Sequence, residues 1–183
     1  MEYGKILSPQ RETANCKPQS HYSRAKLLAT KYILKEKKLP SIILRLYQIY
    51  GPNQKLDRLI PYTITSCLKN IKFNCTEGNQ FRDFLYIDDL TNLIIKIIQQ
   101  KNIKKGIYNV GSGKPKKIKL IIKTIKEITK TGFPQYGNLA MRKDEILNLF
   151  PDIKKVKKTF KWKPNIFLKD GLKRTKRFYE KKK

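Results

Sequence analysis

The chain has 183 residues, which is long enough for one domain with a buried core, and its 39% hydrophobic and 10% aromatic residues exclude a disordered tail. The formal net charge of +28 at pH 7 suggests a polyanionic partner such as nucleic acid. However, only eight of the 42 basic residues are arginine, the residue best suited to bidentate contacts with phosphate and guanine. Lysine that serves mainly as exposed surface is therefore the favoured interpretation, and nucleic acid is an unlikely partner.

Cysteine usage and hydropathy exclude several further classes of protein. Cys16, Cys67 and Cys75 form no CxxC pair and leave one cysteine over, so we expect neither a disulfide framework nor a metal site. The N-terminus has an early acidic residue and no long apolar core, so it does not resemble a signal peptide. The most apolar run, residues 93–98, is interrupted by a lysine and is far shorter than a membrane span. We expect a soluble, cytoplasmic protein with no membrane partner.

The first predicted elements are a helix and a buried strand. Residues 20–38 predict a helix with Ser20 as its N-cap, and its apolar stripe is formed by Leu27, Leu28, Ala29, Tyr32 and Ile33. Residues 41–47 form a short run that is apolar on both faces, which is typical of a buried parallel strand. A helix followed by such a strand indicates an α/β unit.

The rest of the chain continues this alternation. Strands are predicted at 81–87 and 106–110, and helices at 56–70, 88–100, 118–128, 152–160 and 167–181. Asp88 and Asp152 are expected to cap the helices that they begin. A glycine- and proline-containing link is expected at 131–138. The fold class predicted from this order is α/β.

The glycine-rich stretch GSGKP, residues 111–115, is interpreted as a turn between a strand and a helix. A phosphate-binding Walker loop needs a glycine where Tyr108 stands and a serine or threonine where Pro115 stands. The dinucleotide fingerprint GxGxxG fails because Lys116 occupies its third glycine position.

Tyr22 and Lys26 form the first candidate for chemistry. Residues four apart on a helix share one face. A tyrosine has a pKa near 10, so acting as a base near neutral pH needs a shift of about 3 units, or about 4 kcal/mol, and a nearby ammonium supplies part of it. The alternative is a structural tyrosine beside a surface lysine.

The order of short motifs around this pair decides between these alternatives. Following one another along the chain are EYG (2–4), SHYSRAK (20–26), LRLYQIYGPNQ (44–54), RLIP (58–61), GNQFRDFLYIDDL (78–90), YNVGSGKP (108–115), RKDE (142–145), PDIKK (151–155) and FKWKP (160–164). Together they resemble the extended short-chain dehydrogenase/reductase family, specifically the NAD-dependent nucleotide-sugar epimerases and dehydratases. The resemblance covers essentially the whole chain.

The resemblance implies an architecture and a cofactor. The expected fold is the C-terminal part of a Rossmann-type parallel sheet, from residues 1–52 and about 81–100, plus a smaller mixed α/β lobe for the nucleotide sugar, from about 53–80 and 104–183. NAD or NADP is the implied cofactor. Tyr22 is then the catalytic base or acid, Lys26 holds the nicotinamide ribose and lowers the pKa of the tyrosine, and Tyr47 contacts the cofactor.

The resemblance also implies residues that bind a nucleotide-diphosphate sugar. Arg82 and Arg142 match arginines that hold the diphosphate, which suits the guanidinium fork, although salt bridges from Arg82 to Asp83 or from Arg142 to Glu145 are the structural alternative. Arg58 and Leu59 match positions that line the nucleotide site. Gln48 stands where the family commonly has asparagine near the substrate. Asp88 and Asp89 are interpreted as a helix cap rather than a catalytic pair.

One expected part of the family pattern is absent. The glycine-rich turn that seats the cofactor pyrophosphate belongs far upstream of the catalytic tyrosine, but only 21 residues precede Tyr22. The serine or threonine expected just before EYG is also absent. We therefore expect a truncated form or one part of a split enzyme, with an unpaired sheet edge and an uncovered apolar face that a complementing N-terminal half or a homodimer partner would cover.

Three functions follow in order of preference. The first is an NAD(P)-dependent nucleotide-sugar epimerase or dehydratase that serves surface polysaccharide or glycan synthesis, in which Tyr22 removes a proton from a sugar hydroxyl while hydride passes to the nicotinamide. The second is a non-catalytic module that still binds a nucleotide sugar. The third is a basic nucleic-acid-binding protein, whose affinity would fall steeply with salt.

Overall fold

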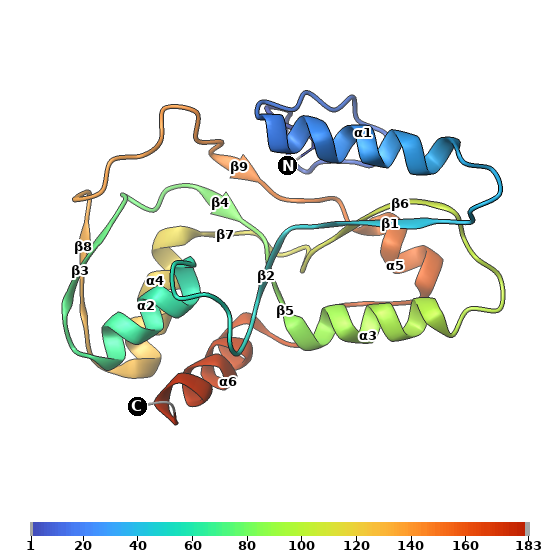
Figure 1. Cartoon of the computed structure of the whole chain (residues 1–183). Helices are drawn as coiled ribbons and strands as arrows, with labels where there is room; N and C mark the ends of the chain where they lie inside the picture. Colours follow the sequence, from blue (N-terminus) through green and yellow to red (C-terminus); the bar gives the residue numbers. More distant parts are fainter. Residues whose placement is uncertain (1, 182–183) are drawn as a thin grey trace.

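A computed structural model describes residues 2–181 and confirms the α/β class. Strand β1 (Ile42–Leu46) runs parallel to β6 (Gly106–Val110), with Leu44 opposite Tyr108. Figure 1 shows α1 (His21–Lys35) on one side of this pair, and α3 (Ile87–Ile98) and α5 (Lys154–Phe160) on the other side. These elements form three layers, helix, sheet and helix.

The second part of the molecule contains three small sheets. Strand β2 (Gln48–Tyr50) pairs in parallel with β5 (Phe84–Tyr86), and β3 (Lys72–Cys75) pairs in parallel with β8 (Phe133–Tyr136). Strand β4 (Phe81–Arg82) lies between β7 (Lys116–Lys117) and β9 (Asn148–Leu149). Helices α2 (Leu59–Leu68), α4 (Ile118–Thr129) and α6 (Leu168–Glu180) pack together beside them. The division of the chain into a Rossmann part and a substrate lobe at the expected boundaries remains a prediction.

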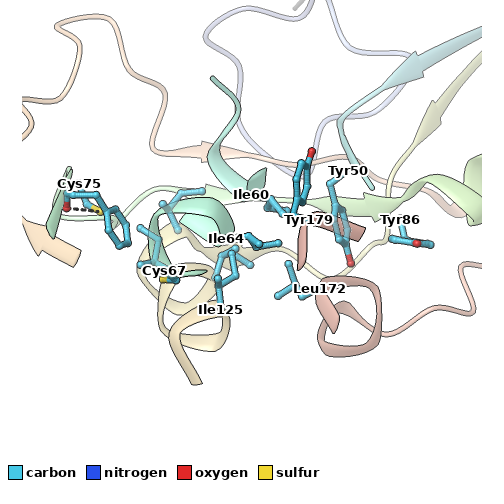
Figure 2. Close-up of a cluster of buried hydrophobic side chains, with 13 residues drawn as sticks. Tyr50, Ile60, Ile64, Cys67, Cys75, Tyr86, Ile125, Leu172 and Tyr179 are labelled. Carbon is cyan, nitrogen blue, oxygen red and sulfur yellow. Dashed lines mark hydrogen bonds between the residues drawn. The ribbon is translucent and has the colours of Figure 1, made fainter. Parts of the chain in front are cut away.

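Two hydrophobic cores hold the elements together. One lies under the β1–β6 pair, where Leu93 of α3, Val156 of α5 and the Trp162 ring are buried. The other, shown in Figure 2, joins α2, α4 and α6 through Ile64, Ile125 and Leu172, with Tyr50 and Tyr86 at its edge. The two rings of Tyr50 and Tyr86 meet edge to face, with centroids 5.4 Å apart. Leu85 is buried in the first core and its neighbour Tyr86 in the second, so β5 connects the two cores.

Helix α1 begins as predicted, but only part of its predicted apolar stripe is covered: Leu27 and Ile33 are half-buried. Ser20 forms a capping box with Ser23, which confirms the predicted N-cap. The side chains that α1 buries are Ser23 and Thr30, both polar. Leu28 is 65% exposed and Tyr32 is 77% exposed, because nothing in residues 2–181 covers that face. The helix is therefore held by polar contacts together with part of its apolar stripe, and the rest of that stripe is open.

The predicted strand at 81–87 is broken at Asp83, which separates β4 from β5. The cause is the Asp83 side chain, which turns into the protein and accepts hydrogen bonds from the backbone of the 111–113 turn. The predicted link at 131–138 contains strand β8, which its parallel partner β3 stabilises.

The aspartates at the start of α3 do not cap it. The N-cap position is Tyr86, because β5 runs directly into the helix. Asp89 is buried and accepts hydrogen bonds from the backbone N–H groups of Asn165 and Ile166, at 2.9 and 3.1 Å. Asp88 forms an exposed ion pair with Arg174. Asp152 behaves closer to expectation, since its carboxylate accepts the Lys154 N–H at the start of α5.

Gly171 of α6 occupies a position that has no room for a side chain. A Cβ atom there would lie 2.1 Å from the Tyr50 hydroxyl oxygen and 2.9 Å from a ring carbon of Tyr86. We expect Gly171→Ala to lower the free energy of unfolding by about 1–3 kcal/mol, measured by urea denaturation. Adding Tyr50→Phe removes the nearest atom and should restore part of the loss. An unchanged free energy of unfolding in Gly171→Ala would contradict this packing.

Candidate functional site

Tyr22 and Lys26 lie on one face of α1, as their spacing predicts. The Lys26 Nζ atom lies over the Tyr22 ring, 5.6 Å from its centroid. Tyr22 is 69% exposed, so its hydroxyl is accessible to a ligand. Both side chains line a cavity of about 340 Å³ together with Tyr47 of the β1–β2 connection. The structure thus brings the predicted catalytic pair and the predicted cofactor residue to one cavity.

The side chain of Tyr47 forms part of the cavity wall, and its hydroxyl proton is already used in a hydrogen bond inside the protein. Its side chain is buried, and its hydroxyl donates a 2.6 Å hydrogen bond to Gln10 Oε1. Burial raises the pKa of Tyr47 far above its usual value, so the phenol stays neutral. Tyr47 can therefore shape the cavity beside Tyr22, but it is not a base.

A buried ion pair anchors the helix that carries Tyr22 and Lys26. The Glu2 carboxylate accepts hydrogen bonds from Arg45 Nε of β1 at 2.9 Å and from Thr30 Oγ1 of α1 at 3.1 Å. The Arg45 guanidinium lies 4.5 Å from the Tyr3 ring centroid. Sequence reasoning missed these residues, because an ion pair 43 residues apart leaves no local pattern. Glu2 thus links α1 to the sheet.

The predicted substrate residues lie at a larger cavity of about 730 Å³. Its lining includes Gln48, Leu59, Arg82 and Arg142. Arg58 lies outside it, at a cavity of about 300 Å³ that shares Gln48 and Leu59 with the larger one. This cavity shares Tyr47 with the cavity at Tyr22. The cavity at Tyr22 and Lys26, the cavity at Arg58 and the larger cavity at Arg142 therefore follow one another, and each shares lining residues with the next.

Arg82 is the most enclosed charge in the larger cavity. It is buried and forms an ion pair with Glu145, while its Nη1 donates to the Phe81 and Leu147 carbonyl oxygens at 2.7 and 3.2 Å. Neither alternative pair expected from the sequence, Arg82–Asp83 or Arg142–Glu145, is formed within residues 2–181. Arg142 is exposed at the cavity wall, where a ligand can reach its guanidinium.

Other residues of the same cavity carry neutral polar groups. Thr63 Oγ1 and Gln80 Oε1 are buried and have no hydrogen-bond partner in the described part of the chain. Burial raises the pKa of the Cys75 thiol to about 11, so Cys75 lines the cavity as a neutral group and is a poor nucleophile. No sequence pattern singles out Thr63 or Gln80, because they meet at one cavity only when α2 packs beside the chain that leads into β4.

Asp83, the residue after Arg82, holds the 111–113 turn in place. Its carboxylate accepts hydrogen bonds from the Ser112 and Gly113 N–H groups at 2.5 and 2.7 Å. We expect Asp83→Ala to lower the free energy of unfolding by about 2–4 kcal/mol, because two buried donors lose their acceptor. Asp88→Ala, which removes only an exposed ion pair, is the control and should have a much smaller effect in the same denaturation experiment. Equal effects of both substitutions would contradict this role.

The structure also tests which groups could bind here. In the described chain, no cluster of histidine, cysteine, aspartate and glutamate could hold a metal ion. No helix among residues 2–181 is long and apolar enough to cross a membrane. For NAD, the cavity at Tyr22, Lys26 and Tyr47 has room for a nicotinamide and its ribose. The GSG turn offers no pyrophosphate cradle, because Asp83 already accepts its N–H groups. The residues present therefore fit one end of the cofactor.

Comparison with known proteins agrees with this geometry. The family model described as "NAD dependent epimerase/dehydratase family" matches residues 1–111. The chain belongs to this family. A curated family member, CDP-abequose synthase of Salmonella muenchen, is 38% identical over 109 residues, 58% of this chain and 37% of that protein. A putative UDP-glucose 4-epimerase of Methanocaldococcus jannaschii is 34% identical over 176 residues, 91% of this chain and 55% of that protein.

Solved structures extend the match to the whole chain. The UDP-glucose 4-epimerase of Thermotoga maritima with UDP-glucose superposes with a TM-score of 0.89 at 26% identity, covering 98% of this chain and 60% of that one. The UDP-glucuronic acid 4-epimerase of Bacillus cereus in complex with UDP-glucuronic acid and NAD gives 0.89 at 25% identity, covering 100% and 59%. The epimerase/dehydratase chain described here thus spans little more than half the length of such relatives.

Proposed function

We propose that this chain provides the nucleotide-sugar site and the catalytic pair of an NAD(P)-dependent nucleotide-sugar epimerase or dehydratase. The observation that carries the proposal is the continuous series of cavities that connects Tyr22 and Lys26, through Tyr47 and Gln48, with Arg82. A nucleotide-diphosphate sugar is long enough to span such a series. The product of the proposed enzyme serves surface polysaccharide or glycan synthesis, and the reaction takes place in the cytoplasm.

The two ends of this series of cavities bind different parts of the nucleotide sugar. At the large cavity, Arg82 and Arg142 bind the diphosphate, and the phosphate oxygens replace Glu145 at the Arg82 guanidinium. Arg58 and Leu59 contact the nucleotide, and Gln48 lies between the diphosphate and the sugar. This arrangement places the sugar near α1.

At the smaller cavity, the Tyr22 phenolate takes the proton from a sugar hydroxyl and becomes the neutral phenol. The Lys26 ammonium, which lies over the same ring, stabilises the negative charge on the phenolate oxygen. The bound nicotinamide supplies the hydride acceptor for this oxidation. Tyr47 fixes the wall of the cavity and excludes water from one side.

The remaining part of the cofactor site needs additional protein. The apolar face of α1 is exposed at Leu28 and Tyr32, and β1 pairs with β6 alone among the described strands. This chain covers 60% and 59% of the two solved relatives named above, so each of them has a further part that the match does not include. We propose that a complementing N-terminal half covers α1 and the open edge of β1 and seats the cofactor pyrophosphate, with a homodimer as the other arrangement.

Calorimetry with a panel of nucleotide sugars tests the proposal. UDP-, CDP- and dTDP-glucose are titrated into the chain, with glucose 1-phosphate as the control that lacks the nucleotide. We expect at least one of the three to bind with one molecule per chain, and glucose 1-phosphate to bind much more weakly. If none of the panel binds to the folded chain, the proposed function is wrong.

A second candidate function is a module that binds nucleotide sugars without catalysis. The absence of a pyrophosphate cradle in the GSG turn of this chain favours it. It predicts that nucleotide sugars bind to the chain as above, and that neither NAD nor a complementing half produces turnover. Turnover in the assembled protein would exclude it.

A further inference from the structure

A separate cavity of about 650 Å³ shares only Phe84 with the proposed nucleotide-sugar cavity. One wall is the turn after β6, with Ser112, Lys114 and Lys116. The other wall is the loop 163–168 between α5 and α6. Neither the catalytic pair nor the two arginines of the proposed function line it.

Buried carboxylates fix both walls from behind. Asp83 accepts the Ser112 and Gly113 N–H groups under the first wall. Asp89 accepts the Asn165 and Ile166 N–H groups under the second. These hydrogen bonds fix the two backbone walls of the cavity relative to the protein. Both carboxylates lie behind the walls, so the charged side chains at the cavity surface are lysines. The cavity is therefore preorganised.

The charge of the cavity has one sign. Lys114, Lys116 and Lys163 line it, and no aspartate or glutamate does. Within residues 2–181 none of the three lysines forms an ion pair. Three ammonium groups that surround one hollow repel one another, and an anion bound between them removes that repulsion.

The same cavity has an apolar and aromatic side. Phe167 is 67% exposed, and Lys114 Nζ lies 5.1 Å from the centroid of its ring. Pro164, Ile166 and Leu168 extend the apolar surface. A large exposed aromatic ring beside cationic groups is suited to a ligand that has both a planar part and a negative charge.

We propose that this cavity binds a small organic phosphate, whose phosphate group contacts the lysines and whose planar or apolar part contacts Phe167. A hollow of this size fits a small molecule. The site goes beyond the proposed function, because its lining has only Phe84 in common with the cavities that would hold the nucleotide sugar and the nicotinamide.

Phenyl phosphate is the probe, titrated by calorimetry into the whole chain. The double variant Lys114→Gln/Lys163→Gln should bind it roughly tenfold more weakly than the unchanged chain. The control Lys101→Gln/Lys173→Gln has the same net charge, removes exposed lysines outside the cavity, and should bind as the unchanged chain does. Phe167→Ala should weaken phenyl phosphate binding several-fold and leave inorganic phosphate binding unaltered.

The outcomes separate this site from the proposed function. If both double variants lost the same amount of affinity for phenyl phosphate, binding would depend on the overall charge of the chain and the proposal would be wrong. It would also be wrong if phenyl phosphate did not bind at all. Nucleotide-sugar affinity should be the same in Lys114→Gln/Lys163→Gln as in the unchanged chain. Phenyl phosphate binding without nucleotide-sugar binding would contradict the proposed function and support this cavity.

Discussion

An Arg82→Gln variant should bind UDP-glucose about tenfold to a hundredfold more weakly than the unchanged chain. Arg82 is the buried guanidinium of the large cavity, and a hydrogen bond between charged groups contributes about 1.5–3 kcal/mol. Glutamine keeps hydrogen-bond donors but removes the charge and the fork that fits two phosphate oxygens. The measurement is calorimetric titration at fixed ionic strength.

Glu145→Gln is the matched control, because it breaks the same ion pair from the other side. If phosphate replaces Glu145 at Arg82, removing the competing carboxylate should leave UDP-glucose affinity unchanged or raise it. Thermal unfolding of both variants reports any loss of structure. If both variants lose affinity to the same extent, the ion pair only positions the 142–147 loop and Arg82 does not bind the diphosphate.

A Tyr22→Phe substitution should lower kcat by about 10²- to 10⁴-fold, because it removes the only acid–base group proposed for the sugar hydroxyl. The protein for this test is a chimera, in which the complementing N-terminal half proposed above is taken from the Methanocaldococcus jannaschii relative and fused to this chain. KM for the nucleotide sugar should change little, since Arg82 and Arg142 still bind the diphosphate.

Tyr32→Phe removes a hydroxyl from an exposed tyrosine of the same helix and serves as the control for that experiment. It should leave kcat and KM as they are. A Tyr22→Phe chimera with full turnover would show that Tyr22 is structural.

Local sequence signals predicted the elements that local interactions determine. Ser20 caps α1 because its hydroxyl and that of Ser23 satisfy each other's backbone within one turn. The apolar run at Ile42–Leu46 forms a strand parallel to β6, as predicted, and its first three residues are half-buried. The ordered motifs indicated the family, which the family model over residues 1–111 confirms.

The errors arise where distant residues decide the structure. The strand at 81–87 breaks because Asp83 binds a turn about 30 residues later, and β8 forms only because β3 lies beside it. Arg82 has a partner 63 residues away, whereas sequence proximity suggested Asp83. Part of the apolar face of α1 is exposed because nothing in residues 2–181 covers it. A periodic sequence pattern predicts an apolar helix face but does not show which element packs against it.

A crystal structure of this chain with UDP-glucose tests the central claim most directly. The claim predicts diphosphate oxygens within hydrogen-bonding distance, about 3 Å, of the Arg82 and Arg142 guanidinium groups, with Glu145 displaced and the sugar directed toward Tyr22. A nucleotide sugar bound with its diphosphate away from both arginines, or with its sugar directed away from α1, would contradict the account.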